Sequence, residues 1–180
     1  MRRSLIALNA MALVLLVGVS ARSQTPSEPF IQIAEVLQSP RCMNCHPAGD
    51  APLQTDESRP HKQNIKRIFS ELGGTCATCH QETAIEGDHI PPAALHWNMP
   101  PAATPMIFEG KTLAQLCADL KDPEQNGHRS LDDLVHHVDH DPLVLWAFNP
   151  GGGRTSPPLS HAEFVALMSE WVALGAPCPN

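Results

Sequence analysis

Apolar side chains recur every three or four residues in several parts of the chain, a spacing that places them on one face of a helix. In the last of these parts, Ser160 and Glu163 form a capping box, and Gly175 stands where a helix would end. Thr112 and Gln115 form a second capping box. The pattern predicts helices over residues 31–38, from Thr112 to Asp122-Pro123, from Ser130 through Val138, and from Ser160 to Gly175.

Long segments without helical spacing separate these helices. Ile90 to Pro105 and Asn149 to Pro158 hold many of the 18 Pro and 11 Gly residues, and the chain has no Tyr. Residues 65–72 have suitable apolar spacing and predict one more helix. We expect a single domain over residues 22–180, mainly α with long irregular Pro- and Gly-rich loops. Loops of this length suit a fold that wraps a flat apolar cofactor.

The first 21 residues have the composition of a signal peptide. Arg2 and Arg3 precede an apolar run of 15 residues from Leu5 to Val19, and Ala21 ends a small-residue cleavage site. A membrane span needs about 20 apolar residues. Removal of this segment changes the formal charge from −7 to −9. We expect a soluble periplasmic protein that is unsuited to nucleic acid and suited to a partner with a basic docking patch.

One five-residue frame, C-x-x-C-H, occurs twice in the sequence. The first copy is Cys42, Cys45 and His46, and the second, 34 residues later, is Cys76, Cys79 and His80. In c-type cytochromes the two thiols of this frame bind the vinyl groups of haem covalently, and the adjacent histidine binds the iron. The sequence therefore predicts two haem c groups, each held by two cysteines and one proximal histidine.

Three other interpretations of the four cysteines explain less of the pattern. A Cys₄ zinc site would give both adjacent histidines no role. A thioredoxin-like dithiol needs a strand-to-helix setting, and Pro40-Arg41 before Cys42 does not predict a strand. Two structural disulfides would again leave His46 and His80 unexplained.

Cys117 and Cys178 remain once the two frames are assigned. In an oxidising compartment, a leftover pair of cysteines is usually a disulfide. Cys117 lies on the helix predicted after Thr112, and Cys178 lies close to the C-terminus. We predict a bridge that fastens the tail to the body of the protein.

Each haem iron has a second axial position, and the sixth ligands are expected among His61, Met106 and His137. His61 lies between the two frames, Met106 has apolar neighbours, and His137 lies at the edge of the apolar stripe of its helix. An open alternative for Met106 is packing against a haem without binding iron. A methionine ligand raises the haem potential and a second histidine lowers it, so His61 and Met106 on different irons would form a directional pair.

Several short stretches extend the pattern beyond the haem frames. They are NCHPAGD (44–50), PMIFEG (105–110), Leu116-Cys117 with Lys121-Asp122-Pro123, DPLV (141–144) and GAPCP (175–179). With the two frames, they make the chain resemble diheme c-type cytochromes of bacteria, and more narrowly the small exported cytochromes called isoquinoline 1-oxidoreductase subunits. That resemblance implies electron acceptance from a molybdenum hydroxylase that oxidises N-heterocycles or aldehydes.

Two functions of different classes are compatible with a diheme protein. An electron carrier would have two six-coordinate irons and would pass electrons from an exported dehydrogenase or hydroxylase to the respiratory chain, through an oxidase or another cytochrome. A diheme peroxidase would keep one iron open for peroxide. A haem-based sensor would also need an output domain, of which the sequence has no sign. We expect the carrier, with a peroxidase-like enzyme as the alternative, because the chain has enough His and Met to fill both positions.

Overall fold

The computed structural model of the protein describes residues 26–72, 76–83 and 90–180. The predicted signal peptide and its cleavage site lie outside the described residues. None of the helices in the described ranges is both long enough and apolar enough to cross a membrane.

Helices dominate the described chain, which also contains a short hairpin. The helices are α1 (Glu28–Leu37), α2 (Pro40–Met43), α3 (Ile68–Glu71), α4 (Leu113–Lys121), α5 (Pro123–Asn126), α6 (Leu131–His140), α7 (Pro142–Phe148) and α8 (His161–Ala173), with a 3₁₀ turn, η1, at Cys76–Thr78. Strands β1 (Leu53–Gln54) and β2 (Arg59–Pro60) pair antiparallel, with Leu53 opposite Pro60. The prediction of a mainly α protein is confirmed.

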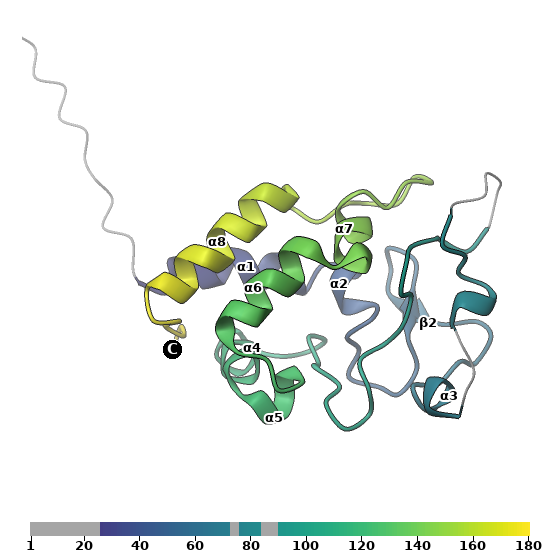
Figure 1. Ribbon diagram of the computed structural model, residues 1–180, viewed down its shortest axis with the longest axis horizontal. Helices are drawn as coiled ribbons and strands as arrows, with labels where there is room; N and C mark the ends of the chain where they lie inside the picture. Colours follow the sequence, from purple (N-terminus) through teal and green to yellow (C-terminus); the bar gives the residue numbers. More distant parts are fainter. Residues whose placement is uncertain (1–25, 73–75, 84–89) are drawn as a thin grey trace, which may run out of the picture.

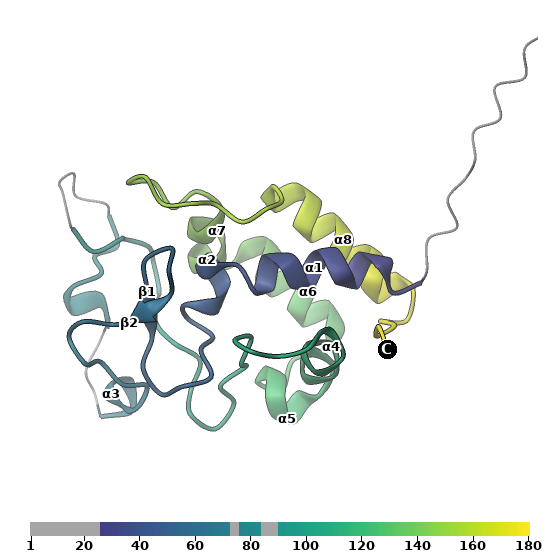
Figure 2. The same ribbon diagram turned by 180° about the vertical axis from the view of Figure 1, so that it is seen from behind.

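The longer helices share one hydrophobic core, in the half of the molecule that holds α1, α4, α6 and α8 (Figure 1). α1 packs against α8, and α8 packs against α6. Figure 2 shows α1 in front of α6 and α8. Phe30 of α1 meets Trp171 of α8 with ring centres 5.2 Å apart, and both side chains are fully buried. Burial of each such side chain contributes about 1.5–3 kcal/mol, which holds these helices together.

Capping boxes determine where three helices begin. The hydroxyls of Thr112, Ser130 and Ser160 each accept a hydrogen bond from the backbone N–H three residues later, and the side chain at that later position accepts one in return. Such a cap is worth about 1 kcal/mol because it satisfies donors that the helix leaves unpaired. The two predicted boxes and the predicted Ser130 cap are confirmed.

Other helix boundaries differ from the prediction. α1 begins at Glu28 instead of residue 31, because Pro29 fits the first turn of a helix. The helix predicted over residues 65–72 is only one turn long, at α3. The apolar spacing does not predict α7, since the run PLVLWAF has no polar face from which to recognise a helix.

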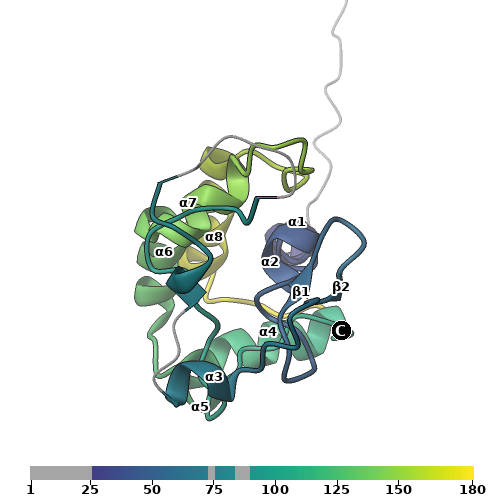
Figure 3. The same ribbon diagram turned by 90° about the vertical axis from the view of Figure 1, so that its right-hand side faces the viewer.

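The other half of the molecule is made of loops, the hairpin and short turns. Figure 3 looks onto this end, with β1, β2 and α3 nearest to the viewer. Arg67, only 5% exposed, connects the loops: its guanidinium donates to the carbonyls of Pro100 and Gly49 at 2.8 and 3.3 Å, and its backbone N–H donates to the Asp50 carbonyl at 2.7 Å. One buried cation thus organises a region with little regular secondary structure.

The C-terminal tail is fastened to the helical half, as the sequence predicts. Cys117 of α4 and Cys178 form a disulfide. Lys121 donates through Nζ to the Ala176 carbonyl at 2.8 Å, and Trp171 donates through Nε1 to the Pro177 carbonyl at 3.0 Å. The disulfide therefore acts together with hydrogen bonds from two neighbouring helices.

Candidate functional site

The first C-x-x-C-H frame begins in α2 and ends in a tight turn. Pro40 occupies the first turn of α2, where a missing N–H costs little. The backbone N–H of His46 then donates to the Cys42 carbonyl at 3.2 Å, which bends the chain by about one helical turn. The two cysteines and the histidine of the frame consequently lie close together.

Residues 106–108 hold His46 through three contacts. Nδ1 of His46 lies 2.7 Å from the Met106 carbonyl oxygen, and the N–H of Phe108 donates to the His46 carbonyl at 2.9 Å. The Phe108 ring stacks on the imidazole, with ring centres 4.0 Å apart and planes 14° apart. These contacts fix the rotation of the His46 ring.

His80 in the second frame has an equivalent environment. Its N–H donates to the Cys76 carbonyl at 2.9 Å, and its Nδ1 lies 2.8 Å from the Pro92 carbonyl oxygen. Trp97 stacks on the imidazole with ring centres 4.2 Å apart, and Trp146 of α7 meets Trp97 edge-on at 4.6 Å. The Pro-rich loop predicted over residues 90–105 therefore provides both a hydrogen-bond acceptor and a stacking partner for His80.

Both imidazoles have the chemistry of a metal ligand. A carbonyl oxygen only accepts hydrogen bonds, so the proton resides on Nδ1 and Nε2 keeps its lone pair. Burial lowers the pKa of His46 to about 4 and also lowers the pKa of His80, which keeps both rings neutral near pH 7. In the described part of the chain, Nε2 of neither ring makes a hydrogen bond. A histidine that binds a metal is commonly held in this way, with its other nitrogen on a carbonyl.

His61 lies opposite His80, at the end of the hairpin. Its backbone N–H donates to the Pro52 carbonyl at 3.0 Å, and its ring centre lies 6.3 Å from that of His80. Two imidazoles on opposite sides of one metal, each bonded at about 2 Å, have ring centres about 6 Å apart. Nδ1 of His61 is buried and has no hydrogen-bond partner among the described residues. The spacing and the unpartnered nitrogen both fit a metal between the two rings.

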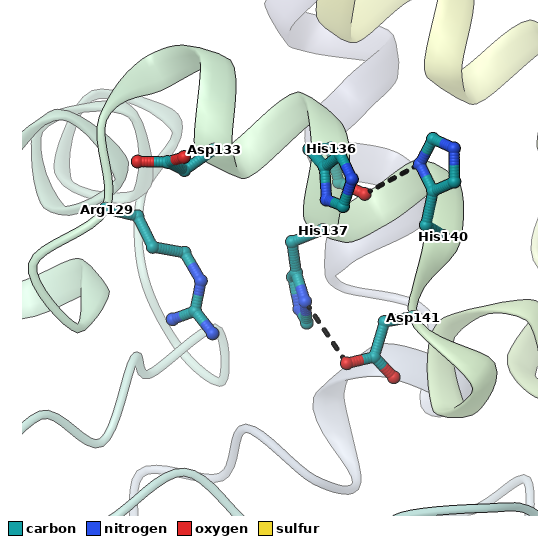
Figure 4. Close-up of a pocket in the computed structure, with 6 residues that line it drawn as sticks. All are labelled: Arg129, Asp133, His136, His137, His140 and Asp141. Atoms are coloured by element: carbon teal, nitrogen blue, oxygen red, sulfur yellow. Dashed lines mark hydrogen bonds and ion pairs between the residues drawn. The ribbon is translucent and has the colours of Figure 1, made fainter.

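Met106 and His137 lie in different positions relative to His46. The Met106 carbonyl is bonded to Nδ1 of His46, and its side chain is buried in the hydrophobic core. His137 instead lines a pocket of ≈ 390 Å³ beside α6, together with Arg129, Asp133, His136, His140 and Asp141. Figure 4 shows His137 and the Arg129 guanidinium extending toward the same side of α6.

The four frame cysteines form no disulfide. Burial raises the pKa of Cys42 to about 12 and that of Cys45 to about 11, and the neighbouring thiol of Cys76 adds to the second shift. A redox-active dithiol needs a lowered thiol pKa, so this environment disfavours a thioredoxin-like role. The effect of Cys76 on Cys45 also indicates that the two frames are neighbours in space.

These residues fit one c-type haem at each frame. Within the described ranges, no group of three or more His, Cys, Asp or Glu side chains is gathered as a metal-binding cluster. The porphyrin itself provides four iron ligands, and a frame needs to add only two thiols and an axial histidine. Each frame offers all three, with the histidine held in the required tautomer.

Several residues at the site were not recognised from the sequence. Phe108 and Trp97 stack on the two frame histidines, and Arg41 lies buried beside Cys42. Phe108 and Arg41 could be found from the sequence, because Phe108 lies two residues after the candidate ligand Met106 and Arg41 directly precedes Cys42. Trp97 has no such signal, since a single tryptophan in a Pro-rich loop does not indicate which ring it covers.

Comparisons with protein-family models, with curated proteins and with solved structures found no match to this chain.

Proposed function

We propose that the protein is an exported electron carrier that holds two c-type haems. The observation that supports this most strongly is the shared environment of His46 and His80. Nδ1 lies beside a backbone carbonyl oxygen in both, at 2.7 Å for His46 and 2.8 Å for His80, and Nε2 makes no hydrogen bond in the described part of the chain. The two cysteines of each frame form no disulfide. A Cys₄ zinc site, a redox dithiol or a pair of disulfides would need none of these histidine contacts.

When bound, a haem would supply one-electron chemistry, and the residues of this chain would set its potential. Cys42 and Cys45 would hold one group, and Cys76 and Cys79 the other. The carbonyls of Met106 and Pro92 would keep the axial imidazoles neutral and fixed in orientation. Burial of His46 in the first frame lowers its pKa. The same burial would favour the less charged oxidation state of a haem bound at that frame.

The proximity of the two frames supports electron transfer between the groups that they would hold. Burial is the main cause of the raised pKa of Cys45, and Cys76 adds to it, although the two residues belong to different frames. The hairpin that ends at His61 is also bonded to the first frame, because Leu53 donates through its N–H to the Asn44 carbonyl at 2.8 Å. The segment between the frames therefore belongs to both sites.

The proposed partners are redox proteins. An exported dehydrogenase or molybdenum hydroxylase would donate electrons, and an oxidase or another cytochrome would accept them. The acidic formal charge of −7 for the full sequence suits docking to a basic patch on either partner. The carrier would be periplasmic and soluble after removal of residues 1–21.

Carbon monoxide and peroxide distinguish this carrier from a diheme peroxidase. In a carrier both irons are six-coordinate, so the reduced wild-type protein should have a spectrum that carbon monoxide does not change. It should also show no enzymatic peroxide turnover, for which rates of roughly 1–10³ per second are typical. A wild-type protein that binds carbon monoxide at one haem and turns over peroxide at such rates would establish the peroxidase instead.

A further inference from the structure

We propose that His137, oriented by Asp141, is the sixth iron ligand at the first frame, so that both haems have two histidine ligands. This inference rests on the proposed diheme function and specifies its iron sites. It differs from the expectation that Met106 occupies one of these positions. Four features of the structure favour the histidine.

The first feature is the side of His46 on which Met106 lies. The Met106 carbonyl accepts from Nδ1 of His46 at 2.7 Å, whereas the iron would bind at Nε2. Phe108, two residues further, donates to the His46 carbonyl and stacks on its ring. The stretch 106–108 thus encloses the proximal histidine. A sixth ligand has to come from across the iron, on the opposite side from His46.

The second feature is the way in which His137 is held. Its Nδ1 lies 3.4 Å from Oδ2 of Asp141, one helical turn later in the chain. Oδ1 of Asp141 accepts from the Leu143 N–H at 2.8 Å and thereby caps α7. The carboxylate is therefore fixed at both oxygens and secures the proton on Nδ1 of His137. A carboxylate behind an imidazole is a common support for a metal-ligating histidine, because it orients the ring and increases its basicity.

The third feature is the position of α6, which packs beside the elements that carry the first frame. α7, which Asp141 caps, packs against both α6 and α2, and Cys42 of α2 borders the hydrophobic core that Leu134 and Val138 of α6 enter. His137 and Arg129 both line the ≈ 390 Å³ pocket, and both extend toward the same side of α6 (Figure 4).

The fourth feature is that the other histidines near α6 are already engaged. His136 and His140 stack on each other with ring centres 4.4 Å apart, and Nδ1 of His140 lies 3.2 Å from the His136 carbonyl. His161 donates through Nε2 to the Val138 carbonyl at 2.9 Å. His136 and His140 line the same pocket but stack on each other, whereas Nδ1 of His137 is held by the anchored Asp141 carboxylate and its Nε2 makes no hydrogen bond in the described part of the chain.

Replacement of His137 by alanine tests the proposal in the full chain matured with haem. His137→Ala should still contain two covalent haems, but one should become high-spin and bind carbon monoxide when reduced. His136→Ala, from the adjacent position of the same helix, is the matched control and should resemble the wild type. Met106→Leu, which conserves volume in the core, should also leave both irons closed to carbon monoxide.

Two measurements keep the test decisive if His137→Ala folds poorly. The oxidised wild-type protein should lack the long-wavelength absorption band of a methionine–iron bond, and its electron paramagnetic resonance should show two low-spin irons with paired imidazoles. Asp141→Asn should keep both irons six-coordinate and shift the potential of one haem to a more positive value. Asp132→Asn, an exposed change on the same helix, should leave both potentials unchanged.

The outcomes separate this inference from the proposed function. A wild-type protein with no covalent haem would contradict the proposed function itself. A protein with two haems that shows the methionine–iron band, or in which Met106→Leu rather than His137→Ala opens an iron, would overturn only the assignment of His137. A wild-type spectrum with paired imidazoles, together with an opened iron in His137→Ala, would support it.

Discussion

A histidine that binds a metal usually keeps one nitrogen protonated and fixed while the other remains free. His46 and His80 meet this condition through carbonyls, and His137 meets it through the Asp141 carboxylate. His161 does not meet it, because its Nε2 already donates to a carbonyl. At the scale of single residues, the partner of each ring nitrogen thus separates His161 from the candidate ligands.

A buried ion pair beside Cys42 supports the first frame. The Arg41 side chain is 4% exposed and pairs with Asp56, whose side chain is 34% exposed. Thr155 donates to the other oxygen of Asp56 through both its N–H and its hydroxyl, at 3.0 and 2.7 Å. These hydrogen bonds, with the charge of Arg41, lower the pKa of the Asp56 carboxyl. Asp56 therefore joins α2 to the loop at Thr155, which lies 99 residues after Asp56 in the chain.

Asp56→Asn should destabilise the protein by about 1–3 kcal/mol at pH 7, because Arg41 would remain buried without its charged partner. The lowered pKa of Asp56 means that its contribution is present above the ordinary value of about 4 and is lost as the pH falls through the lowered value. Denaturant unfolding at several pH values should show a smaller loss on acidification in the variant than in the wild type. Glu170→Gln, an exposed change on α8, is the control. Equal acid sensitivity in wild type and Asp56→Asn would contradict this role.

The residues of the two frames could be identified from the sequence because their relation is local. A histidine directly after the second cysteine needs no knowledge of the rest of the fold. The role of Met106 depends on a contact across 60 residues, which no local pattern specifies. Its apolar neighbours are equally compatible with a ligand and with a core residue whose carbonyl holds His46.

The hairpin of β1 and β2 connects the first frame to His61, whose ring lies near that of His80. Asn44, inside the first frame and 8% exposed, donates through Nδ2 to the Thr55 carbonyl at 2.9 Å. The other end of the hairpin leads directly into His61. A change inside the first frame should therefore affect the iron site that we propose at the second.

Asn44→Ala should loosen the hairpin and weaken the hold on His61. We expect carbon monoxide to bind a fraction of the reduced haem at the second frame, while the first remains closed. Gln125→Ala, on the exposed side of α5, should bind none. Carbon monoxide difference spectra of the two variants check this expectation. It would be contradicted if Asn44→Ala opened neither haem, or opened only the haem at its own frame.

Among the secondary-structure elements, the sequence predicts best the helices that have both a cap and a polar face. α4, α6 and α8 satisfy both conditions, and their caps are found as expected. α2 and α5 are single turns, too short to repeat an apolar spacing. The hairpin has only two residues in each strand, so it has no alternation to recognise.

At the scale of the whole molecule, a helical half with an ordinary core supports a half that is mostly loops. The disulfide between Cys117 and Cys178 closes a loop of 61 residues within the helical half. Arg67 connects loops within the other half through backbone carbonyls. Which loop covers which frame could not be predicted from the sequence, because Pro- and Gly-rich segments have no apolar periodicity to fix their packing.

Removal of the disulfide should lower stability without affecting the haem frames. The double variant Cys117→Ala/Cys178→Ala should lose about 2–4 kcal/mol of unfolding free energy, mainly because its unfolded chain is less constrained. Denaturant unfolding measures the loss, and the visible spectrum should remain that of the wild type. Labelling of wild-type protein without reduction should leave both thiols unmodified. Uptake of label at both cysteines, or loss of a haem in the double variant, would contradict this arrangement.

The central claim is that each chain binds two haems covalently, and the intact mass of the mature protein tests it most directly. Protein from a host with c-type maturation machinery should have the mass of the chain after Ala21 plus two haems, under denaturing conditions that remove any noncovalent group. Cys45→Ala and Cys79→Ala should each lack one haem and retain the other. A wild-type mass equal to that of the polypeptide alone, or with a single haem, would contradict the account.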